Sequence, residues 1–209
     1  MKGKKGAGTS PAPTMGDDVG ATLAVARVER EAMTLPNGWA WTTIGEVSIT
    51  TSGGTPSRKR PDFYGGNIPW VKSGELNDDI VSTVEEFITQ HGLGNSNAKI
   101  FARGTALVAL YGATVGKTGI LGIDAATNQA VCAIFPLQNA FTSKYIQYWL
   151  QSQRQTLISM SSGGAQPNIS QAIIRSFPFP LAPLAEQHRI VAEIEKQFTR
   201  LDAGVAALK

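Results

Sequence analysis

The chain has 209 residues, 42% of them hydrophobic and 17% charged, which suits one domain with an appendage or two small domains and excludes disorder throughout. Its formal net charge of +3, from 19 Lys and Arg against 16 Asp and Glu, is weak evidence for a nucleic-acid partner unless the basic groups cluster. One cysteine and two histidines exclude disulfide and zinc frameworks, and because no apolar run is long enough to cross a bilayer we expect a soluble, cytosolic protein.

The N-terminal part of the chain differs in composition from the remainder. Residues 1–34 mix Lys, Gly, Ser and Pro without apolar periodicity, which predicts a flexible extension. Residues 36–38 are a Pro-Asn-Gly turn, and apolar residues become frequent after it. We therefore expect the globular domain to begin at residue 35. Its first predicted core residues are Trp39, Trp41, Ile44 and Val47.

Runs of apolar, β-branched and aromatic residues predict strands in the middle of the chain. Residues 68–71 predict a short strand, whereas residues 85–97 are ambiguous, with a turn expected at 92–94. Three further runs, separated by Gly, Asp and Thr, predict an antiparallel meander. They are residues 105–111, 117–121 and 128–135.

Apolar spacings of three and four predict helices in the C-terminal part. One helix covers residues 142–160 with Thr142 as its N-cap, and a further helical turn covers residues 171–176. Residues 177–180 (FPFP) must be extended, because each Pro disfavours the α conformation in the residue before it. A last helix begins near Pro183 and carries apolar residues at coiled-coil spacing, which a partner helix or the chain's own domain must cover. This helix-pairing seam consists of Val191, Ile194, Phe198, Leu201, Val205 and Leu208.

One glycine-rich turn has some features of a phosphate-binding loop. Residues 112–118 (GATVGKT) follow an apolar strand, but three residues separate the glycines where a phosphate loop needs four, and a strand is expected to follow in place of a helix. A nucleotide-using enzyme built on this turn stays open beside a tight turn with Lys117 exposed. Cys132 lies within an apolar run, which predicts an inert, buried thiol, and the sequence patterns of serine hydrolases are absent.

Four polar, Gly-flanked loops are suited to contact another molecule, and nucleic acid fits their chemistry. Arg and Lys can neutralise phosphates, and the amides of Gln166 and Asn168 can offer paired donor and acceptor atoms to an adenine edge. The loops are residues 53–60, 72–75, 111–117 and 163–170. The candidate DNA-binding residues are Thr55, Ser57, Arg58, Lys59, Arg60, Lys72, Ser73, Lys99, Lys117, Gln166 and Asn168.

Taken together, these loops resemble the specificity subunit of type I restriction-modification systems. The similar stretches follow the family's order over residues 35–209, and their combination is very specific. They are LPNGW at 35–39, GTPS at 54–57, IPW at 68–70 with SGE at 73–75, YGATVGK at 111–117, DAATNQA at 124–130, GGAQPNIS at 163–170 and PLAEQHRIV at 183–191.

The resemblance implies an α+β fold: a mixed α/β target recognition domain with antiparallel strands at residues 35–181, followed by a long coiled-coil helix at 182–209. It implies a non-catalytic subunit that reads one half of a bipartite DNA target and recruits modification subunits. The expected partners are double-stranded DNA, modification (methyltransferase) subunits, restriction subunits and, through the helix, a second copy of the chain. No cofactor is expected in this chain, since S-adenosylmethionine, ATP and Mg belong to the partner subunits.

Members of the family carry two such domains and two helices, whereas this sequence has one of each. We therefore expect a natural half-subunit, a truncated reading frame or a part of a longer protein. Because the shared stretches recur in members with different targets, the segments between them are better candidates for reading bases. These segments are residues 58–62, 72–79 and 95–99. A helix-pairing adaptor that does not bind DNA is the remaining alternative.

Overall fold

A computed structural model of the chain describes residues 34–161 and 168–208. Its strands are β1 (Ala40–Thr43), β2 (Ser48–Ser52), β3 (Tyr64–Val71), β4 (Ile80–Val81), β5 (Phe87–Ile88), β6 (Ile100–Phe101), β7 (Ala106–Ala109), β8 (Thr118–Leu121), β9 (Ala125–Thr127), β10 (Val131–Pro136) and β11 (Pro178–Leu181). Its α-helices are α2 (Ile44–Val47), α3 (Gln90–Gly94), α4 (Ser143–Ser152), α5 (Arg154–Ser159), α6 (Gln171–Ser176) and α7 (Leu184–Ala206). Its 3-10 turns are η1 (Pro61–Phe63), η2 (Ser73–Glu75), η3 (Gly112–Thr114) and η4 (Leu137–Asn139).

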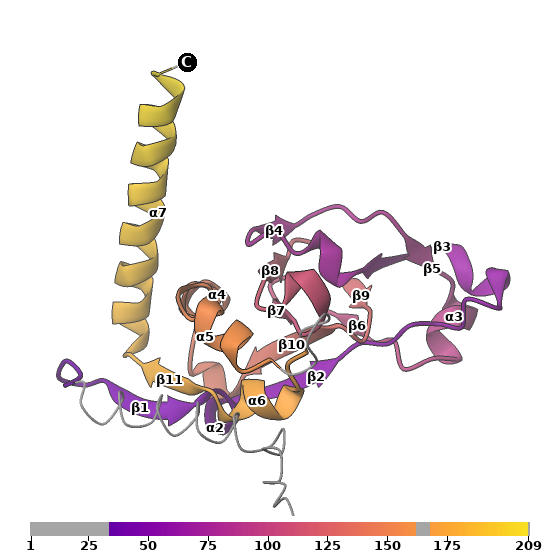
Figure 1. The fold of residues 1–209 in the computed structure, drawn as a ribbon, viewed down its shortest axis with the longest axis horizontal. Helices are drawn as coiled ribbons and strands as arrows, with labels where there is room; N and C mark the ends of the chain where they lie inside the picture. Colours follow the sequence, from indigo (N-terminus) through magenta and orange to yellow (C-terminus); the bar gives the residue numbers. More distant parts are fainter. Residues whose placement is uncertain (1–33, 162–167, 209) are drawn as a thin grey trace, which may run out of the picture.

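Two β-sheets pack against each other, and helices cover the outer face of the larger sheet (Figure 1). The larger sheet has the strand order β2-β10-β7-β8-β4, and the smaller sheet has the order β5-β3-β9-β6. Neighbouring strands are antiparallel, apart from the parallel pairs β4–β8 and β3–β9. The expected α+β fold with antiparallel strands is confirmed.

The central strands β7 and β10 are buried on both faces because each face meets a different layer. Side chains alternate along a strand, so Val108 and Cys132 face the helices while Leu107 and Val131 face the smaller sheet. This double burial explains why both strands are continuous apolar runs. Burial also raises the pKa of the Cys132 thiol to about 12, in agreement with the predicted inert thiol.

The predicted meander is wrong in its strand order. The strands β7, β8 and β10 are antiparallel neighbours of the expected type, but β10 pairs with β7 on the side opposite to β8. The reason is β9, which lies between β8 and β10 in the chain and belongs to the smaller sheet. The chain therefore leaves the larger sheet after β8 and returns on the other side of β7. The turn expected at residues 92–94 is the end of the short helix α3.

The helix expected over residues 142–160 is two helices. Thr142 caps α4 as predicted, because its side chain accepts a hydrogen bond from a backbone amide of the first turn. The helical path breaks at Gln153, with φ −98° and ψ 8°, although no Gly or Pro stands there. Immediately after the break, Arg154 forms an ion pair with Asp78. Tertiary contacts of this kind override local helix propensity.

A two-stranded ladder joins the two ends of the sheet-containing part. The strands β1 and β11 pair antiparallel, with Ala40 opposite Leu181. The predicted extended segment at residues 177–180 thus contributes to a strand, and the predicted helical turn at 171–176 is α6. The division into an extension, a domain at 35–181 and a helix at 182–209 stays a prediction, and residues 1–33 lie outside the described residues.

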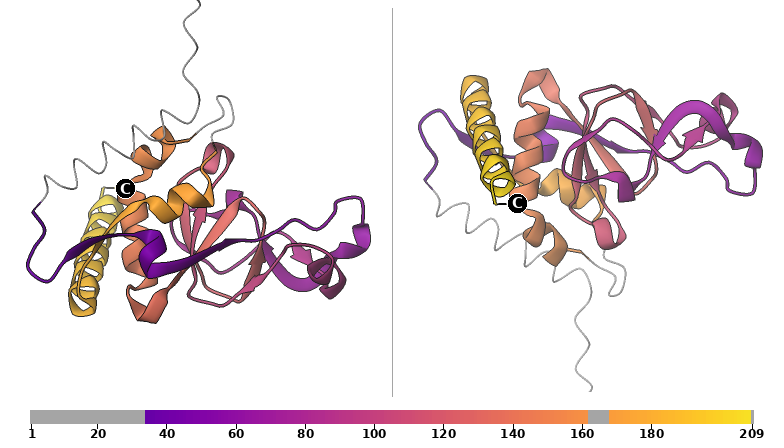
Figure 2. Two further views of the ribbon diagram at one scale, coloured as in Figure 1. Left: turned by 90° about the horizontal axis from the view of Figure 1, so that it is seen from below. Right: turned by 90° about the horizontal axis from the view of Figure 1, so that it is seen from above.

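The long helix α7 leaves this ladder and stands beside α4 (Figures 1 and 2). Pro183 precedes its first turn, a position that Pro favours because no intrahelical amide is needed there. Gln187 is fully buried and anchors the helix. Its Oε1 accepts the Thr142 amide at 3.0 Å, and its Nε2 donates to the carbonyl oxygens of Ala140 and Ala182, each at 2.9 Å. Among the described residues, no helix has the length and apolar character to span a membrane.

Candidate nucleic-acid interface

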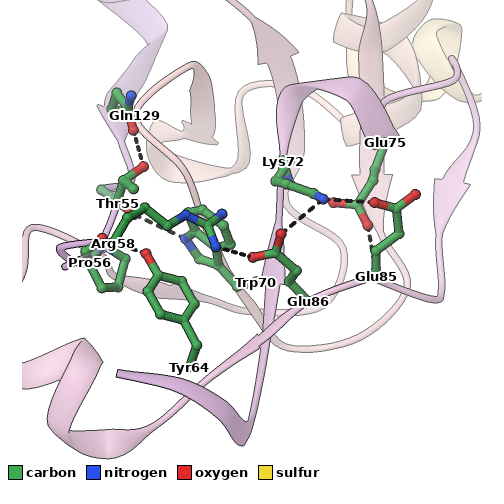
Figure 3. A network of polar contacts seen from close by, with 11 residues as sticks. Thr55, Pro56, Arg58, Tyr64, Trp70, Lys72, Glu75, Glu85, Glu86 and Gln129 are labelled. Carbon is green, nitrogen blue, oxygen red and sulfur yellow. Dashed lines mark hydrogen bonds and ion pairs between the residues drawn. The ribbon is translucent and has the colours of Figure 1, made fainter. Parts of the chain in front are cut away.

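The loop between β2 and η1 carries five of the eleven predicted DNA-binding residues, and two aromatic side chains of β3 hold it. Trp70 Nε1 donates a hydrogen bond to the Gly54 carbonyl oxygen at 3.0 Å, and the Tyr64 hydroxyl donates to the Pro56 carbonyl oxygen (Figure 3). The two rings also meet edge to face, with centroids 6.1 Å apart. Because Trp70 is 2% exposed, these bonds attach the loop to the core of the smaller sheet.

The same loop also packs closely against the backbone at Asn97. A Cβ atom on Gly54 would lie 2.4 Å from the carbonyl carbon of Asn97, so no larger residue fits there without displacing the backbone. Ser57 then closes a turn, since its carbonyl oxygen accepts the Arg60 amide at 3.0 Å. The predicted residue Ser73 also closes a turn in the next loop, where its carbonyl oxygen accepts the Leu76 amide at 3.3 Å at the end of η2.

Arg58 lies over the two aromatic rings. Its guanidinium carbon is 4.3 Å from the ring centroid of Tyr64 and 5.2 Å from that of Trp70. Its Nη1 is 2.8 Å from Oε2 of Glu86, and this contact is the main cause of the raised pKa of Arg58 and the lowered pKa of Glu86. Within the described chain, this oxygen has no further hydrogen-bond partner and is shielded from solvent. The Arg58 side chain nevertheless remains 55% exposed.

Lys72 reaches the same carboxylate from another loop (Figure 3). Its Nζ lies 3.3 Å from Glu86 Oε1 and 2.7 Å from Glu85 Oε2, and the bond to Glu85 is the main cause of the raised pKa of Lys72. Glu75 fastens the two segments, because its carboxylate accepts the backbone amides of Lys72 at 2.6 Å and Glu85 at 2.8 Å. The structure thus brings the predicted residues Arg58 and Lys72 together at Glu86.

A second charged cluster surrounds Asp62. Arg60 donates to both of its carboxylate oxygens, at 2.8 and 2.7 Å, and lies over the Phe63 ring at 4.7 Å from its centroid. The Arg60 hydrogen bond is the main reason that the pKa of Asp62 falls to about 2. His91 Nδ1 lies 3.1 Å from Asp62 as well. No third metal-ligating side chain joins them, and the described residues contain no group of three or more that could hold a metal ion.

Three further candidates differ in how firmly they are held. The Thr55 hydroxyl donates to Oε1 of Gln129 (Figure 3), and Lys99 Nζ donates to the Thr51 hydroxyl at 2.8 Å. Lys59 is exposed and forms no ion pair or hydrogen bond with the described residues. Of the basic cluster at residues 58–60, it is therefore the one cation without a protein anion among those residues.

The turn at residues 112–118 does not have the structure of a phosphate loop. Its 3-10 turn η3 is followed by the strand β8, whereas a phosphate loop requires a helix there. The prediction that Lys117 is exposed is wrong, because the side chain is half-buried. The helix α5 lies over the turn, and Arg154 Nε donates to the Gly116 carbonyl oxygen at 3.1 Å. These features do not support the nucleotide-using alternative.

Asn168 belongs with this turn and not with the Arg58 loop. It forms an isolated antiparallel bridge with Tyr111, and the next residue, Ile169, donates its amide to the Leu110 carbonyl oxygen at 2.9 Å. Gln166, predicted to act with Asn168, lies outside the described residues. The structure therefore places Arg58 and Lys72 in one group of predicted residues, and Lys117 of the 112–118 turn with the nearby Asn168 in another.

The helix-pairing seam divides along α7. Its first residues are half-buried: Val191 packs on the domain core, and Ile194 lines a hollow with Trp39 and Trp149. Its later residues are largely exposed, although the Phe198 ring also contacts Tyr148 of α4. The exposed fractions are 52% for Phe198, 61% for Leu201, 46% for Val205 and 89% for Leu208.

Sequence reasoning missed Tyr64, Trp70 and Glu86. The two aromatic residues lie in one strand, but β3 is irregular between Tyr64 and Ile68, so simple alternation of side chains could not have paired Tyr64 with Trp70. Nothing local links Glu86 to Arg58. Their contact depends on the pairing of β5 with β3, where Phe87 lies opposite Pro69.

Comparison with known proteins connects this arrangement with one family. The family model described as type I restriction modification DNA specificity domain matches residues 36–204. The specificity subunit of the type I restriction enzyme EcoR124I/EcoR124II from Escherichia coli is 26% identical over 162 residues, which are 75% of this chain and 40% of that protein. The specificity subunit of the type I restriction enzyme MjaIX from Methanocaldococcus jannaschii is 26% identical over 161 residues, 75% of this chain and 37% of that protein.

Solved structures show the same fold. A chain from a structure on complex assembly and conformational transition of the type I R-M system has a TM-score of 0.69 and 22% identity, and the match covers 92% of this chain and 48% of that one. The crystal structure of the HsdS subunit from Thermoanaerobacter tengcongensis has a TM-score of 0.68 and 22% identity, over 92% of this chain and 47% of that one. This chain thus spans less than half the length of each of these relatives.

Proposed function

The chain belongs to the family of type I restriction-modification DNA specificity domains, and we propose that it is a DNA-recognition module that reads one half of a bipartite target. The family match over residues 36–204 carries this proposal. The chemistry of the Arg58 loop supports it, since guanidinium and ammonium groups on a rigid support are the usual ligands of DNA phosphates.

In this proposal the Arg58 loop and the Lys72 loop form the DNA-facing surface. The aromatic rings of Tyr64 and Trp70 hold the Arg58 guanidinium by its face, and the N–H groups at its edge, one of which contacts Glu86, point toward phosphate oxygens in the proposed complex. Lys59 adds a cation that no described anion neutralises. The segments 58–62, 72–79 and 95–99 remain the candidates for contacts with base edges.

We propose further that the module is not catalytic and that it recruits modification (methyltransferase) and restriction subunits. S-adenosylmethionine, ATP and Mg would then act in those partners and not in this chain. The exposed half of the helix-pairing seam supports a protein partner for α7, because several large apolar side chains lie open there. The proposed occupant is α7 of a second copy of this chain.

The proposal is tested by the salt dependence of DNA binding. If about four phosphates are neutralised, the slope of log K against log salt should be about −0.9 for each. The double variant Arg58→Ala with Lys59→Ala should flatten this slope by about one to two units. Lys59 gives up a full phosphate contact, and Arg58 gives up one to the extent that it exchanges Glu86 for a phosphate. Fluorescence anisotropy with a short duplex of random sequence measures the slope.

A matched double variant, Arg103→Ala with Arg175→Ala, removes the same charge from exposed positions on other elements. Its slope should equal that of the wild type. If the control flattens the slope and the Arg58–Lys59 variant does not, the DNA-binding surface lies elsewhere. Absence of binding by the wild type in low salt would contradict the proposed function itself.

A further inference from the structure

We infer that Glu86 is an internal competitor of DNA phosphates: its carboxylate occupies the phosphate-binding groups of Arg58 and Lys72 and so weakens binding to DNA of any sequence. This inference rests on the proposed function and adds a side chain that opposes phosphate binding. The two cations predicted to neutralise phosphates already share one carboxylate (Figure 3).

The geometry of Glu86 is that of a phosphate substitute. Its Oε2 lies 2.8 Å from Arg58 Nη1, and its Oε1 lies 3.3 Å from Lys72 Nζ, so one anion bridges cations from two loops. Guanidinium and ammonium groups contact phosphate oxygens through the same N–H donors. A DNA phosphate can therefore take these donors only by displacing the carboxylate or by lying beside its negative charge.

Glu86 is held in this place by its own backbone. Its carbonyl oxygen accepts the Trp70 amide at 3.0 Å, which fixes the residue beside β3. Its side chain is 32% exposed, whereas that of the neighbouring Glu85 is 74% exposed. Glu85 contacts Lys72 alone, so it competes for one cation where Glu86 competes for two.

The aromatic support of Arg58 does not depend on Glu86. Tyr64 and Trp70 contact the face of the guanidinium, and both donate hydrogen bonds to the backbone of its loop. When the carboxylate is neutralised, the guanidinium should therefore stay in position with its edge free. The effect expected is more phosphate binding, not collapse of the site.

This competition lowers the affinity for random and target DNA alike. Phosphate contacts are available on any sequence, whereas base contacts form only on the target. A fixed electrostatic cost to phosphate binding lowers the affinity for all DNA, and on the target the base contacts offset it. Because the cost is the same for both, the ratio of the two affinities does not change, but fewer chains stay bound to non-target DNA.

The test compares Glu86→Gln with Asp124→Asn, a matched control that removes the same charge from an exposed position. Asp124 accepts a hydrogen bond from the Arg103 amide at 2.7 Å, and Asn can accept the same bond. Binding to a short duplex of random sequence is measured by fluorescence anisotropy across a salt series. For Glu86→Gln we expect a slope steeper by about 0.9 for each phosphate gained, or about a threefold larger loss of affinity between 50 and 200 mM salt.

The control should keep the wild-type slope, and Glu85→Gln, a second variant at a more exposed position, should show a smaller steepening. If the wild type binds DNA and Glu86→Gln equals the control or binds more weakly, the inference is wrong and the proposed function stands. If the wild type and all three variants fail to bind, the proposed function is wrong and the inference falls with it. Far-ultraviolet circular dichroism verifies that each variant keeps its helix content. If Glu86→Gln does not fold, Glu86→Asp, whose shorter side chain withdraws the carboxylate from both cations, takes its place, and a wild-type slope in that variant overturns the inference.

Discussion

Arg58 is held from two directions by contacts of different kinds. Aromatic rings lie against its face, and a carboxylate lies at its edge. The aromatic contacts persist when the edge exchanges one anion for another, because cation–π attraction uses the face of the group. The side chain is thus ordered before any ligand arrives, which reduces the conformational entropy lost on binding.

Gly54 gives the first prediction at this scale. Replacement by Ala should lower the free energy of unfolding by about 1–3 kcal/mol, because the added Cβ would press against the Asn97 backbone and overpacking of that kind is destabilising. Gly74→Ala is the matched control, since nothing lies within 4 Å of a Cβ built there. Urea denaturation of the two variants measures the difference. Equal unfolding midpoints for both would show that the Gly54 loop adapts freely.

Single residues were predictable from sequence where the signal is local. The N-cap role of Thr142 depends on the turn after it, and the burial of Cys132 depends on its apolar neighbours. The carboxylate partners of Arg58 and Lys72 were not predictable, because both contacts join segments that only the β3–β5 pairing brings together. The half-buried state of Lys117 has the same kind of cause, since α5 covers its turn from a distant part of the chain.

At the scale of elements, periodic segments were predictable and their arrangement was not. The helices α6 and α7 and the core of β3 lie where the apolar pattern places them. The strand order of the larger sheet was missed because β9 is only three residues long, too short for a periodic signal. The break between α4 and α5 was missed because the sequence has no helix breaker at Gln153.

The helix α7 gives the prediction at this scale. We expect the isolated chain to form a concentration-dependent dimer through the exposed part of the helix-pairing seam, where each apolar side chain is worth about 1.5–3 kcal/mol when fully buried. Leu201→Glu should return the chain to a monomer, because a carboxylate on the seam cannot be buried without a partner. Sedimentation equilibrium at micromolar concentrations measures the association.

Ala203→Glu serves as the control for that experiment. It adds the same charge to an exposed position of α7 that lies outside the seam, so the variant should still dimerise. A wild type that remains monomeric, with the same helix content as Leu201→Glu, would mean that α7 has no affinity for a second copy of itself.

At the scale of the whole molecule, dimerisation determines the form of the DNA target. Two identical domains related by a two-fold axis should read two identical half-sites, so the target should be a split inverted repeat. We expect selection from a random duplex library to enrich inverted repeats with a constant spacer for the wild type. The Leu201→Glu variant should enrich single half-sites only, with weaker overall binding. Enrichment of an asymmetric two-part motif by the wild type alone would contradict this symmetry.

The pairing of β1 with β11 has a consequence for what can be exchanged. Because Ala40 lies opposite Leu181, the chain enters and leaves the two-sheet body through adjacent strands. The β1–β11 pair thus forms a short stem that closes the segment between these two strands into one loop-like unit, and α7 begins just beyond the stem. If the segment between β1 and β11 were replaced by a different one on the same stem, the surface loops would change while α7 kept its starting point and direction. The stem thereby separates the loops proposed to face DNA from the helix proposed to pair with a partner.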